Sequence, residues 1–263
     1  MKKNLFYISC LIFFIIPVLL MVIKSVTTPW RSGIALDWTL RGWEVVFQDS
    51  RVVESMWTTL LIALAVALIN LLAGIPIAKA LSHRSFPLKN TLEVILLLPL
   101  FLPIMAAAMG LHITMIRMGL ANTWLGVTIV HLVPTIPYTI KVLKAGYDRI
   151  PQDMLNQGRM LKAGTWHAFR TIELPMLIPS IRSSIFLAVT ISAGQYVLTA
   201  IIGGGSVLTM PIIYYPFLQS ADDTVMAAFS IAFVMIPAAA IMIAEAAAML
   251  VAGRSFLKRM SVL

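Results

Sequence analysis

Long apolar runs separated by short polar segments dominate this chain. A helix needs about 20 apolar residues to cross a hydrocarbon layer about 30 Å thick. The sequence offers six candidates of that length, near 4–24, 56–81, 92–116, 120–143, 180–202 and 225–252. The pattern therefore predicts an all-α membrane protein with six transmembrane helices.

The third and fourth candidates form the least regular pair. Only residues 117–119 separate them, and four prolines interrupt their helical pattern: Pro99, Pro103, Pro134 and Pro137. Proline is tolerated within a membrane where neighbouring helices satisfy the freed carbonyls. We therefore expect two complete spans joined by a tight hairpin.

The composition supports a protein that crosses the membrane several times. Hydrophobic residues make up 60% of the chain and charged residues 12%, whereas soluble domains carry roughly 25% charged residues. The mean hydropathy is +0.92. The single cysteine, Cys10, lies in the first apolar run, so one chain can build neither a disulfide framework nor a cysteine metal site.

The basic residues predict the orientation in the membrane. With six spans, one face of the membrane carries both termini and the segments 82–91 and 144–179, and it holds fifteen of the twenty Lys and Arg. These are Lys2, Lys3, Lys79, Arg84, Lys89, Lys141, Lys144, Arg149, Arg159, Lys162, Arg170, Arg182, Arg254, Lys258 and Arg259. The positive-inside rule makes this face cytoplasmic, so both termini are expected inside and the charge of +9 is a topology signal.

The polar interruption at 150–175 is the stretch best suited to contact a soluble partner. We expect a short helix over 151–161, ended by Gly164, and a second over 165–173 that Pro175 stops. The second helix has Trp166 and Phe169 on one face. Such a helix pair fits a groove on a soluble protein, or it lies on lipid headgroups.

This stretch resembles the EAA loop of ATP-binding cassette importer permeases. The pattern of that loop is Glu-Ala-Ala, three residues, Gly, nine residues and then Ile-x-Leu-Pro. Ten residues fall in register with it: Ile150, Pro151, Arg159, Leu161, Ala163, Trp166, Phe169, Ile172, Leu174 and Pro175. The resemblance implies that ATPase coupling rests on Asn156, Gln157, Gly158, Arg159, Lys162, Gly164, Trp166 and Phe169.

The chain departs from the pattern at two places. Asn156, Gln157 and Gly158 occupy the Glu-Ala-Ala positions, and Lys162 occupies the Gly position. Glycine is the residue best suited to a left-handed turn, so we expect Gly164 to supply that turn instead. We interpret the stretch as a modified coupling loop and expect a second, different permease chain with a more regular loop.

The resemblance extends over nearly the whole chain. Residues 74–78 (Gly-Ile-Pro-Ile-Ala) are similar to a Gly-x-Pro-Leu-Ala segment of the family, and 96–103 to its third span. Residues 195–199 (Gln-Tyr-Val-Leu-Thr), followed by the glycines 203–205, are similar to the branch that imports polyamines, ferric iron, thiamine and related solutes.

The family implies a single permease domain over 1–263 with the type I importer fold and a cytoplasmic coupling helix. Such a domain forms half of a solute pathway in the bacterial inner membrane. Its implied partners are a cytoplasmic ATPase dimer, a second permease and an extracytoplasmic solute-binding protein. The chain has no Gly-x-x-x-x-Gly-Lys-Ser/Thr loop, so we expect no cofactor here, ATP and Mg in the partner ATPase, and a non-catalytic subunit.

Polar side chains inside spans usually face the interior of a helix bundle, so they are candidates to line a solute pathway. The candidates are Gln195, Tyr196, Thr199, Asn70 and His131. The alternative is interhelical hydrogen bonding. For His131 and His112 packing is favoured over a metal or proton relay, because no acidic residue lies nearby in sequence.

Three carboxylates near or within spans have open roles. Glu245 lies within the sixth span, near its cytoplasmic end, where it can snorkel or pair with a basic residue. Asp222 and Asp223 precede that span and can meet a binding protein, attract a cation, or lie in a solvated loop.

Two other classes of protein stay open. A self-sufficient secondary transporter needs internal repeats and coupled ionisable sites at the midplane. A membrane-embedded enzyme needs clustered His or acidic residues at one depth. The sequence shows neither pattern, and dependence on ATP and partner chains separates the permease from both.

Overall fold

The computed structural model describes residues 2–30, 35–160, 164–218 and 222–252. The described chain is nearly all helical, and one isolated antiparallel bridge pairs Thr27 with Trp38. The residues form two compact units: residues 1–59 with 208–236, and residues 60–207 with 237–263. We call these unit 1 and unit 2. The two longest helices, α3 (Ser50–His83) and α12 (Asp223–Ala252), contribute to both.

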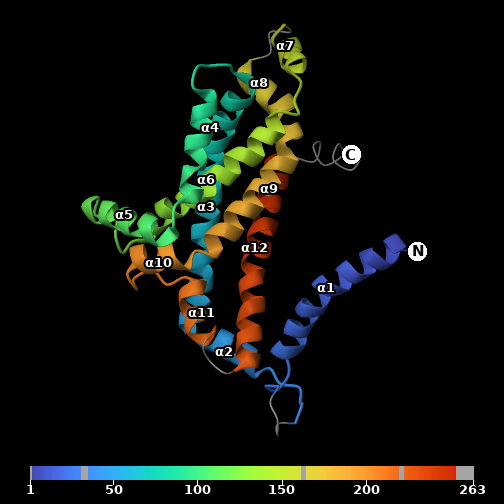
Figure 1. Cartoon of the computed structure of the whole chain (residues 1–263), viewed down its shortest axis with the longest axis vertical. Coiled ribbons are helices and arrows are strands. Elements are labelled where there is room, and N and C mark those ends of the chain that lie inside the picture. Colours follow the sequence, from blue (N-terminus) through green and yellow to red (C-terminus); the bar gives the residue numbers. More distant parts are fainter. Residues whose placement is uncertain (1, 31–34, 161–163, 219–221, 253–263) are drawn as a thin grey trace. The chain divides into compact units, whose positions relative to one another are not determined.

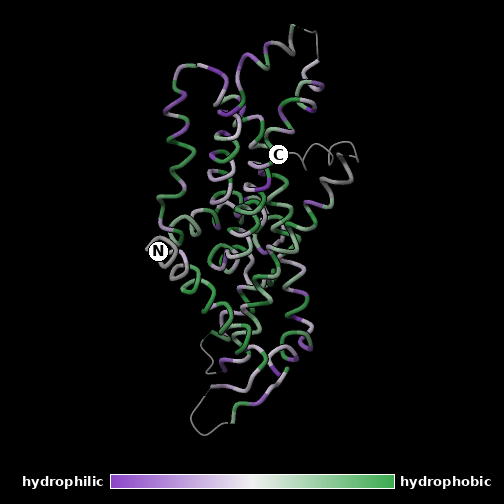
Figure 2. The backbone as a smooth tube through the Cα atoms, turned by 90° about the vertical axis from the view of Figure 1, so that its right-hand side faces the viewer, coloured by the Kyte–Doolittle hydropathy of each residue, from purple (hydrophilic) through white to green (hydrophobic). Residues whose placement is uncertain are grey.

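Four helical segments in the described part are long and apolar enough to cross a membrane. They are α3, α6 (Trp124–Tyr147), the continuous segment Thr165–Ala193 and the described part of α12. A fifth span results if the bent pair Lys89–Phe101 and Ile104–Arg117 counts as one. In α1 (Lys2–Ser25) the described apolar stretch, Leu11–Ser25, is shorter than a span needs. The expectation of several spans is confirmed at four to five. Figure 2 shows the hydrophobic residues along most of the helical tube, with hydrophilic residues mainly at helix ends and in connections.

The expected third span is broken. It consists of α4 (Lys89–Leu97), a 3-10 turn η1 (Leu98–Phe101) and α5 (Ile104–Arg117), and the axes of the two parts differ by 100°. The break falls at Leu102, which is extended with ψ of 135°, directly before Pro103. A residue before proline is pushed out of the helical region, so Pro103 breaks the helix here. The predicted span over 92–116 is thus present only if this bent pair counts as one span, whereas α6 is a single helix despite Pro134 and Pro137.

The expected fifth span, 180–202, is also broken. Helix α9 (Leu174–Ala193) ends at Gly194, and α10 (Tyr196–Gly203) begins after Gln195. Gly194 is a poor helix residue and takes a turn conformation in which the Gln195 N–H bonds to the Ser192 carbonyl. A further short helix, α11 (Met210–Leu218), follows in unit 1.

The loop at 150–175 holds the first short helix that the sequence predicts, as α7 (Gln152–Met160). The predicted stop at Pro175 was wrong. Helix α8 (Thr165–Ala168) continues through a wide π-helical turn, η2 (Phe169–Glu173), directly into α9. Pro175 stands in the first turn of α9, next to the widened turn, where its missing N–H and its ring cause least conflict. The second short helix is therefore the beginning of a span.

Unit 2 is built around α6, which packs along α9. Among its described residues, two groups of buried apolar side chains contribute to its core. The first contains Ile62, Val66, Ala108, Met115, Val127, Val130, Leu198, Ile202 and Val207. The second lies below the loop and contains Ala78, Leu143, Tyr147, Ile150, Leu155 and Leu177. In Figure 1, α7 and α8 lie at the end of this unit where α6 ends and α4 begins.

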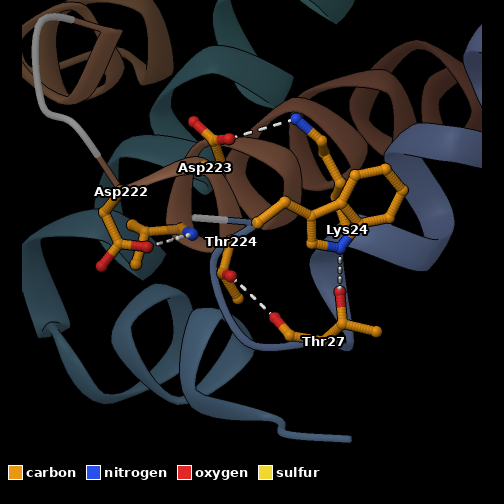
Figure 3. A network of polar contacts seen from close by, with 7 residues as sticks. Lys24, Thr27, Asp222, Asp223 and Thr224 are labelled. Atoms are coloured by element: carbon orange, nitrogen blue, oxygen red, sulfur yellow. Dashed lines mark hydrogen bonds and ion pairs between the residues drawn. The ribbon is translucent and has the colours of Figure 1, made fainter. Parts of the chain in front are cut away.

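In unit 1 a polar network joins the end of α1 to the start of α12 (Figure 3). Lys24 Nζ lies 3.1 Å from Asp223 Oδ2, and the Thr224 hydroxyl donates to the Thr27 carbonyl at 2.7 Å. Asp222 pairs with Arg41, the first residue of α2 (Arg41–Gln48). Both aspartates are thus engaged within the chain, which the sequence did not indicate.

The contact between α6 and α9 depends on a small residue. A Cβ added at Gly146 would come within 2.8 Å of Ser180 Cβ, whereas one at Gly110 in α5 would meet nothing within 4 Å. Small residues let membrane helices approach closely. We expect Gly146→Ala to lower the free energy of unfolding by about 1–3 kcal/mol through overpacking. Gly110→Ala should leave it unchanged or slightly raise it. Thermal unfolding of the purified chain in detergent measures both, and equal midpoints would contradict this packing.

Candidate functional site

The loop at 150–175 is anchored from below by apolar side chains. Ile150 and Leu155 are buried in the second apolar group of unit 2, beside Tyr147 and Leu177. Ile172 packs against the same group. Helix α7 is thus held to the ends of α3, α6 and α9 rather than extending freely from them.

The outer side of the loop exposes apolar side chains. Trp166 in α8 is 71% exposed, and Met154 and Met160 of α7 are exposed as well. The Trp166 and Phe169 rings stack with centroids 5.7 Å apart and planes at 28°. Large apolar side chains on a polar connection are typical of a surface that docks a partner.

The other residues expected in this site are placed as follows. Asn156 lies in α7 and is exposed. Gln157, Gly158 and Arg159 belong to the same helix, but their side chains lie outside the described residues, as does Lys162 entirely. Gly164 has φ of −60° and ψ of 154°, so the expectation that it supplies a left-handed turn was wrong. It is an extended N-cap of α8, a position that glycine fills readily.

A buried ionic network lies beneath the loop. The Glu173 side chain, at the end of η2, is 3% exposed. Its Oε1 accepts from Lys79 Nζ of α3 at 2.6 Å, and its Oε2 accepts from the Tyr147 hydroxyl of α6 at 3.2 Å. One carboxylate therefore joins three helical elements.

Sequence reasoning missed Glu173. The only signal was a carboxylate two residues before Pro175, in the variable position of the Ile-x-Leu-Pro motif, with a lysine inside the apolar run of α3. Charges at such positions need a partner, because isolated charges in an apolar environment are costly.

A second, more exposed set of contacts surrounds the end of α6. Asp148 accepts from Ser82 Oγ at 2.6 Å and from Lys144 Nζ at 3.2 Å. Burial acts to raise the pKa of Asp148, but the hydrogen bonds from Ser82 and Lys144, together with the charges of Lys144 and Lys89, hold the pKa below its ordinary value. The carboxylate is therefore charged at neutral pH and binds α3 to α6.

The candidate pathway residues divide by burial. Gln195 and Tyr196 are half-buried at the break between α9 and α10. His131 is buried, with Nδ1 2.9 Å from Ser192 Oγ and Nε2 3.0 Å from Thr199 Oγ1. Asn70 is buried, and neither its Oδ1 nor its Nδ2 has a hydrogen-bond partner among the described residues. A role of any of these in lining the pathway stays a prediction.

Glu245 pairs with a basic residue, which is one of the two roles that the sequence analysis left open for it. Arg182 Nη2 of α9 donates to Glu245 Oε2 of α12 at 2.7 Å, and both residues belong to unit 2. The two side chains are 44% and 26% exposed, so this pair is much less buried than that of Lys79 with Glu173.

Comparison with known families decides what this helical membrane chain is. The family model described as "Binding-protein-dependent transport system inner membrane component" matches residues 70–260, which include the loop and the Lys79–Glu173 pair. The chain belongs to this family. It is thus a multi-pass inner-membrane permease component of the ATP-binding cassette importers, as its loop indicated.

Two curated relatives and one solved structure agree with this assignment. The molybdate/tungstate transport system permease protein WtpB of Thermococcus kodakarensis is 31% identical over 135 residues, which are 51% of this chain and 54% of that protein. The match thus spans about half the length of that relative. The putative 2-aminoethylphosphonate transport system permease protein PhnV of Salmonella typhimurium is 23% identical over 86% of each chain.

The solved structure shares the fold. It is the crystal structure of a bacterial ABC transporter involved in the import of the acidic polysaccharide alginate, with a TM-score of 0.69 over 92% of this chain and 95% of that one, at 14% identity. Assignment of the permease to the polyamine, ferric iron and thiamine branch stays a prediction, since neither relative is named for those solutes.

The buried network of the permease predicts an asymmetry between its two charged members. Removing Lys79 leaves Glu173 charged and buried, and breaking a buried ion pair in this way costs about 3–5 kcal/mol. Removing Glu173 leaves Lys79, which is 38% exposed and can extend toward water. We therefore expect Lys79→Met to lower the free energy of unfolding more than Glu173→Gln does. Denaturant unfolding in detergent micelles measures the difference, and an equal or reversed order would contradict the burial seen here.

Proposed function

We propose that this permease forms one half of the solute pathway of an importer and couples to cytoplasmic ATPase subunits through the loop at 150–175. The observation that carries the proposal is the exposed Trp166 ring, stacked on the half-buried Phe169 ring, on a segment that continues without interruption into α9. An amphipathic helix of this kind fits a groove on a soluble partner. Because the helix is continuous, movement of its exposed end reaches the membrane directly.

We further propose six spans with both termini in the cytoplasm. This count adds α1 and takes the bent pair of α4 and α5 as one span. The excess of Lys and Arg on the face that carries the loop supports this orientation. In this topology the loop faces the cytoplasm, where an ATPase would reach it.

The proposed partners follow from the family and from the coupling role proposed for the loop. They are a cytoplasmic ATPase dimer that supplies ATP and Mg, an extracytoplasmic solute-binding protein and a second permease. The Asn-Gln-Gly sequence at 156–158 in place of Glu-Ala-Ala supports a second permease that differs from this chain. Closure of the ATPase dimer on ATP would move the two loops and rock the permease halves between inward-open and outward-open states.

We place a small oxyanion ahead of a polyamine, thiamine or ferric iron as the solute. The support is that the two relatives are named for molybdate or tungstate and for a phosphonate. Uptake of radiolabelled molybdate, tungstate, sulfate, 2-aminoethylphosphonate, spermidine, thiamine and ferric iron by cells with and without this chain tests the choice. ATP-dependent uptake of an oxyanion supports it, and uptake of a polyamine, thiamine or iron instead would contradict it.

The coupling role of the loop predicts the effect of a single truncation. We expect Trp166→Ala to leave membrane insertion intact and to reduce import per ATP hydrolysed about fivefold or more, the scale of a coupling free energy of 1–3 kcal/mol. Trp124→Ala is the matched control, because Trp124 is 61% exposed at the other end of α6. Import and phosphate release are measured in the same proteoliposomes, with the solute identified by the uptake screen. Equal coupling in the two variants would mean that Trp166 is not at the contact.

The pathway candidates predict different reactivities. The chain has one cysteine, so Cys10→Ser gives a cysteine-free background. In that background we expect Gln195→Cys, at the half-buried break, to react with a small water-soluble thiol reagent. Thr199→Cys, at a position only 1% exposed, should react at least about tenfold more slowly because burial limits access. A protected Gln195→Cys would remove this residue from the pathway.

A further inference from the structure

We infer that the Lys79–Glu173–Tyr147 network is the device that carries movement of the coupling loop into α3 and α6. The inference rests on the proposed function. It assigns the transmission of movement to residues that lie below the contact surface. Glu173 acts here as a positioning residue, since it lies below the surface that would meet an ATPase. Its role is to connect that surface to two membrane helices.

Glu173 lies at the junction between the loop and α9. It is the last residue of η2 and lies one helical turn after Phe169, whose ring stacks on Trp166. The Trp166–Phe169 stack and the buried carboxylate therefore belong to one continuous helical segment, Thr165–Ala193. A displacement of Trp166 moves Glu173 with it.

Glu173 binds two membrane helices at once. Its two oxygens bind groups from different helices, Lys79 Nζ at 2.6 Å and Tyr147 Oη at 3.2 Å. The apolar group that contains Tyr147 lies beside this network, and apolar packing alone is non-directional. The charged pair and the hydroxyl fix both distance and direction, so α3 and α6 must follow the junction between the loop and α9 or lose their bonds to it.

The Glu173 end of its ion pair with Lys79 is shielded from water. The Glu173 side chain is 3% exposed, and water therefore cannot replace Lys79 without opening the packing. A buried carboxylate that loses its cation is strongly disfavoured, which makes separation of the pair costly during a cycle. The wide π-helical turn that ends at Glu173 supports the same reading, since such turns often mark functional positions in helices.

Transmission differs from simple stabilisation in one testable way. Replacing both members of a buried ion pair by well-packed hydrophobic residues of similar volume is often neutral for stability, whereas removing one member alone is costly. Lys79→Met with Glu173→Gln removes both charges and nearly keeps both volumes, so it should restore folding relative to Lys79→Met alone. It lacks the ionic link to α3, although the amide oxygen at position 173 can still accept from Tyr147. The matched control is Arg182→Gln with Glu245→Gln, which removes the more exposed ion pair between α9 and α12.

The experiment uses the complete complex in proteoliposomes, with Cys10→Ser and Gln195→Cys as a reporter in every variant. The probes are a methanethiosulfonate reagent, Mg-ATP and vanadate. In the parent, trapping with ATP and vanadate should change the rate of labelling at position 195. The Lys79→Met/Glu173→Gln variant should still hydrolyse ATP, but its nucleotide-induced change in labelling rate should fall about fivefold or more, the scale of a coupling free energy. The control should keep the change seen in the parent.

The possible outcomes test the transmission role separately from the proposed function. A Lys79→Met/Glu173→Gln variant that responds as the parent does would overturn the transmission role and leave the proposed function standing. A parent that hydrolyses ATP without any change in labelling would overturn the proposed coupling and this inference with it. If the Lys79→Met/Glu173→Gln variant does not assemble, Lys79→Met/Glu173→Leu, which replaces the pair by apolar side chains of similar volume and makes no directional bond, is judged by the same two results.

Discussion

Backbone amides and carbonyls inside a hydrocarbon layer have no water to bond, and this constraint governs the rest of the structure. It requires helices wherever the chain contacts lipid and allows irregular backbone only where protein covers it or a cavity is lined. The interruptions in this chain are therefore informative. One lies between η1 and α5, at Leu102 and Pro103, and another between α9 and α10, at Gly194 and Gln195. The second places a half-buried glutamine where a membrane helix has been opened, which is the setting expected for a solute contact.

The same constraint makes every buried charge significant. In the described core Glu173 is a buried carboxylate, and its partners come from α3 and α6. The pair of Arg182 with Glu245 and the pairs of unit 1 are more exposed, and exposed ion pairs contribute only about 0–1 kcal/mol. The buried network is thus the polar feature best able to impose a geometry on the membrane helices. It lies beneath the apolar surface that the loop presents. In the proposed function, the contact surface on α8, the buried network and the break after α9 follow one another along a single stretch of the chain.

Much of this arrangement could be predicted from the sequence, and the reasons for the misses are physical. The long apolar runs of α3 and α12 predict spans because hydrophobic length is a property of the local chain. The loop could be found because its polarity contrasts with its surroundings. The partner of Glu173 could not be found, because Lys79 is 94 residues away and only packing brings the two together. For the same reason the engagement of Asp222 and Asp223 within unit 1 was not foreseen.

Proline and glycine show the limits of local rules. Pro103 breaks a helix, Pro137 leaves one intact, and Pro175 stands in the first turn of α9 after a widened turn. Which outcome occurs depends on what surrounds the freed carbonyl, and a single sequence does not contain that information. Gly164, expected in a left-handed turn, is an extended cap instead.

The central claim is that the apolar surface around Trp166 is the contact with the ATPase. The most direct measurement places a photo-crosslinking amino acid at position 166 of the chain in its native membrane, activates it, and identifies the attached molecule by mass spectrometry. The account predicts a cytoplasmic protein with a phosphate-binding loop of the ATPase type, and no such product from the same probe at position 124. Attachment at position 166 to lipid alone, or to an extracytoplasmic protein, would contradict it.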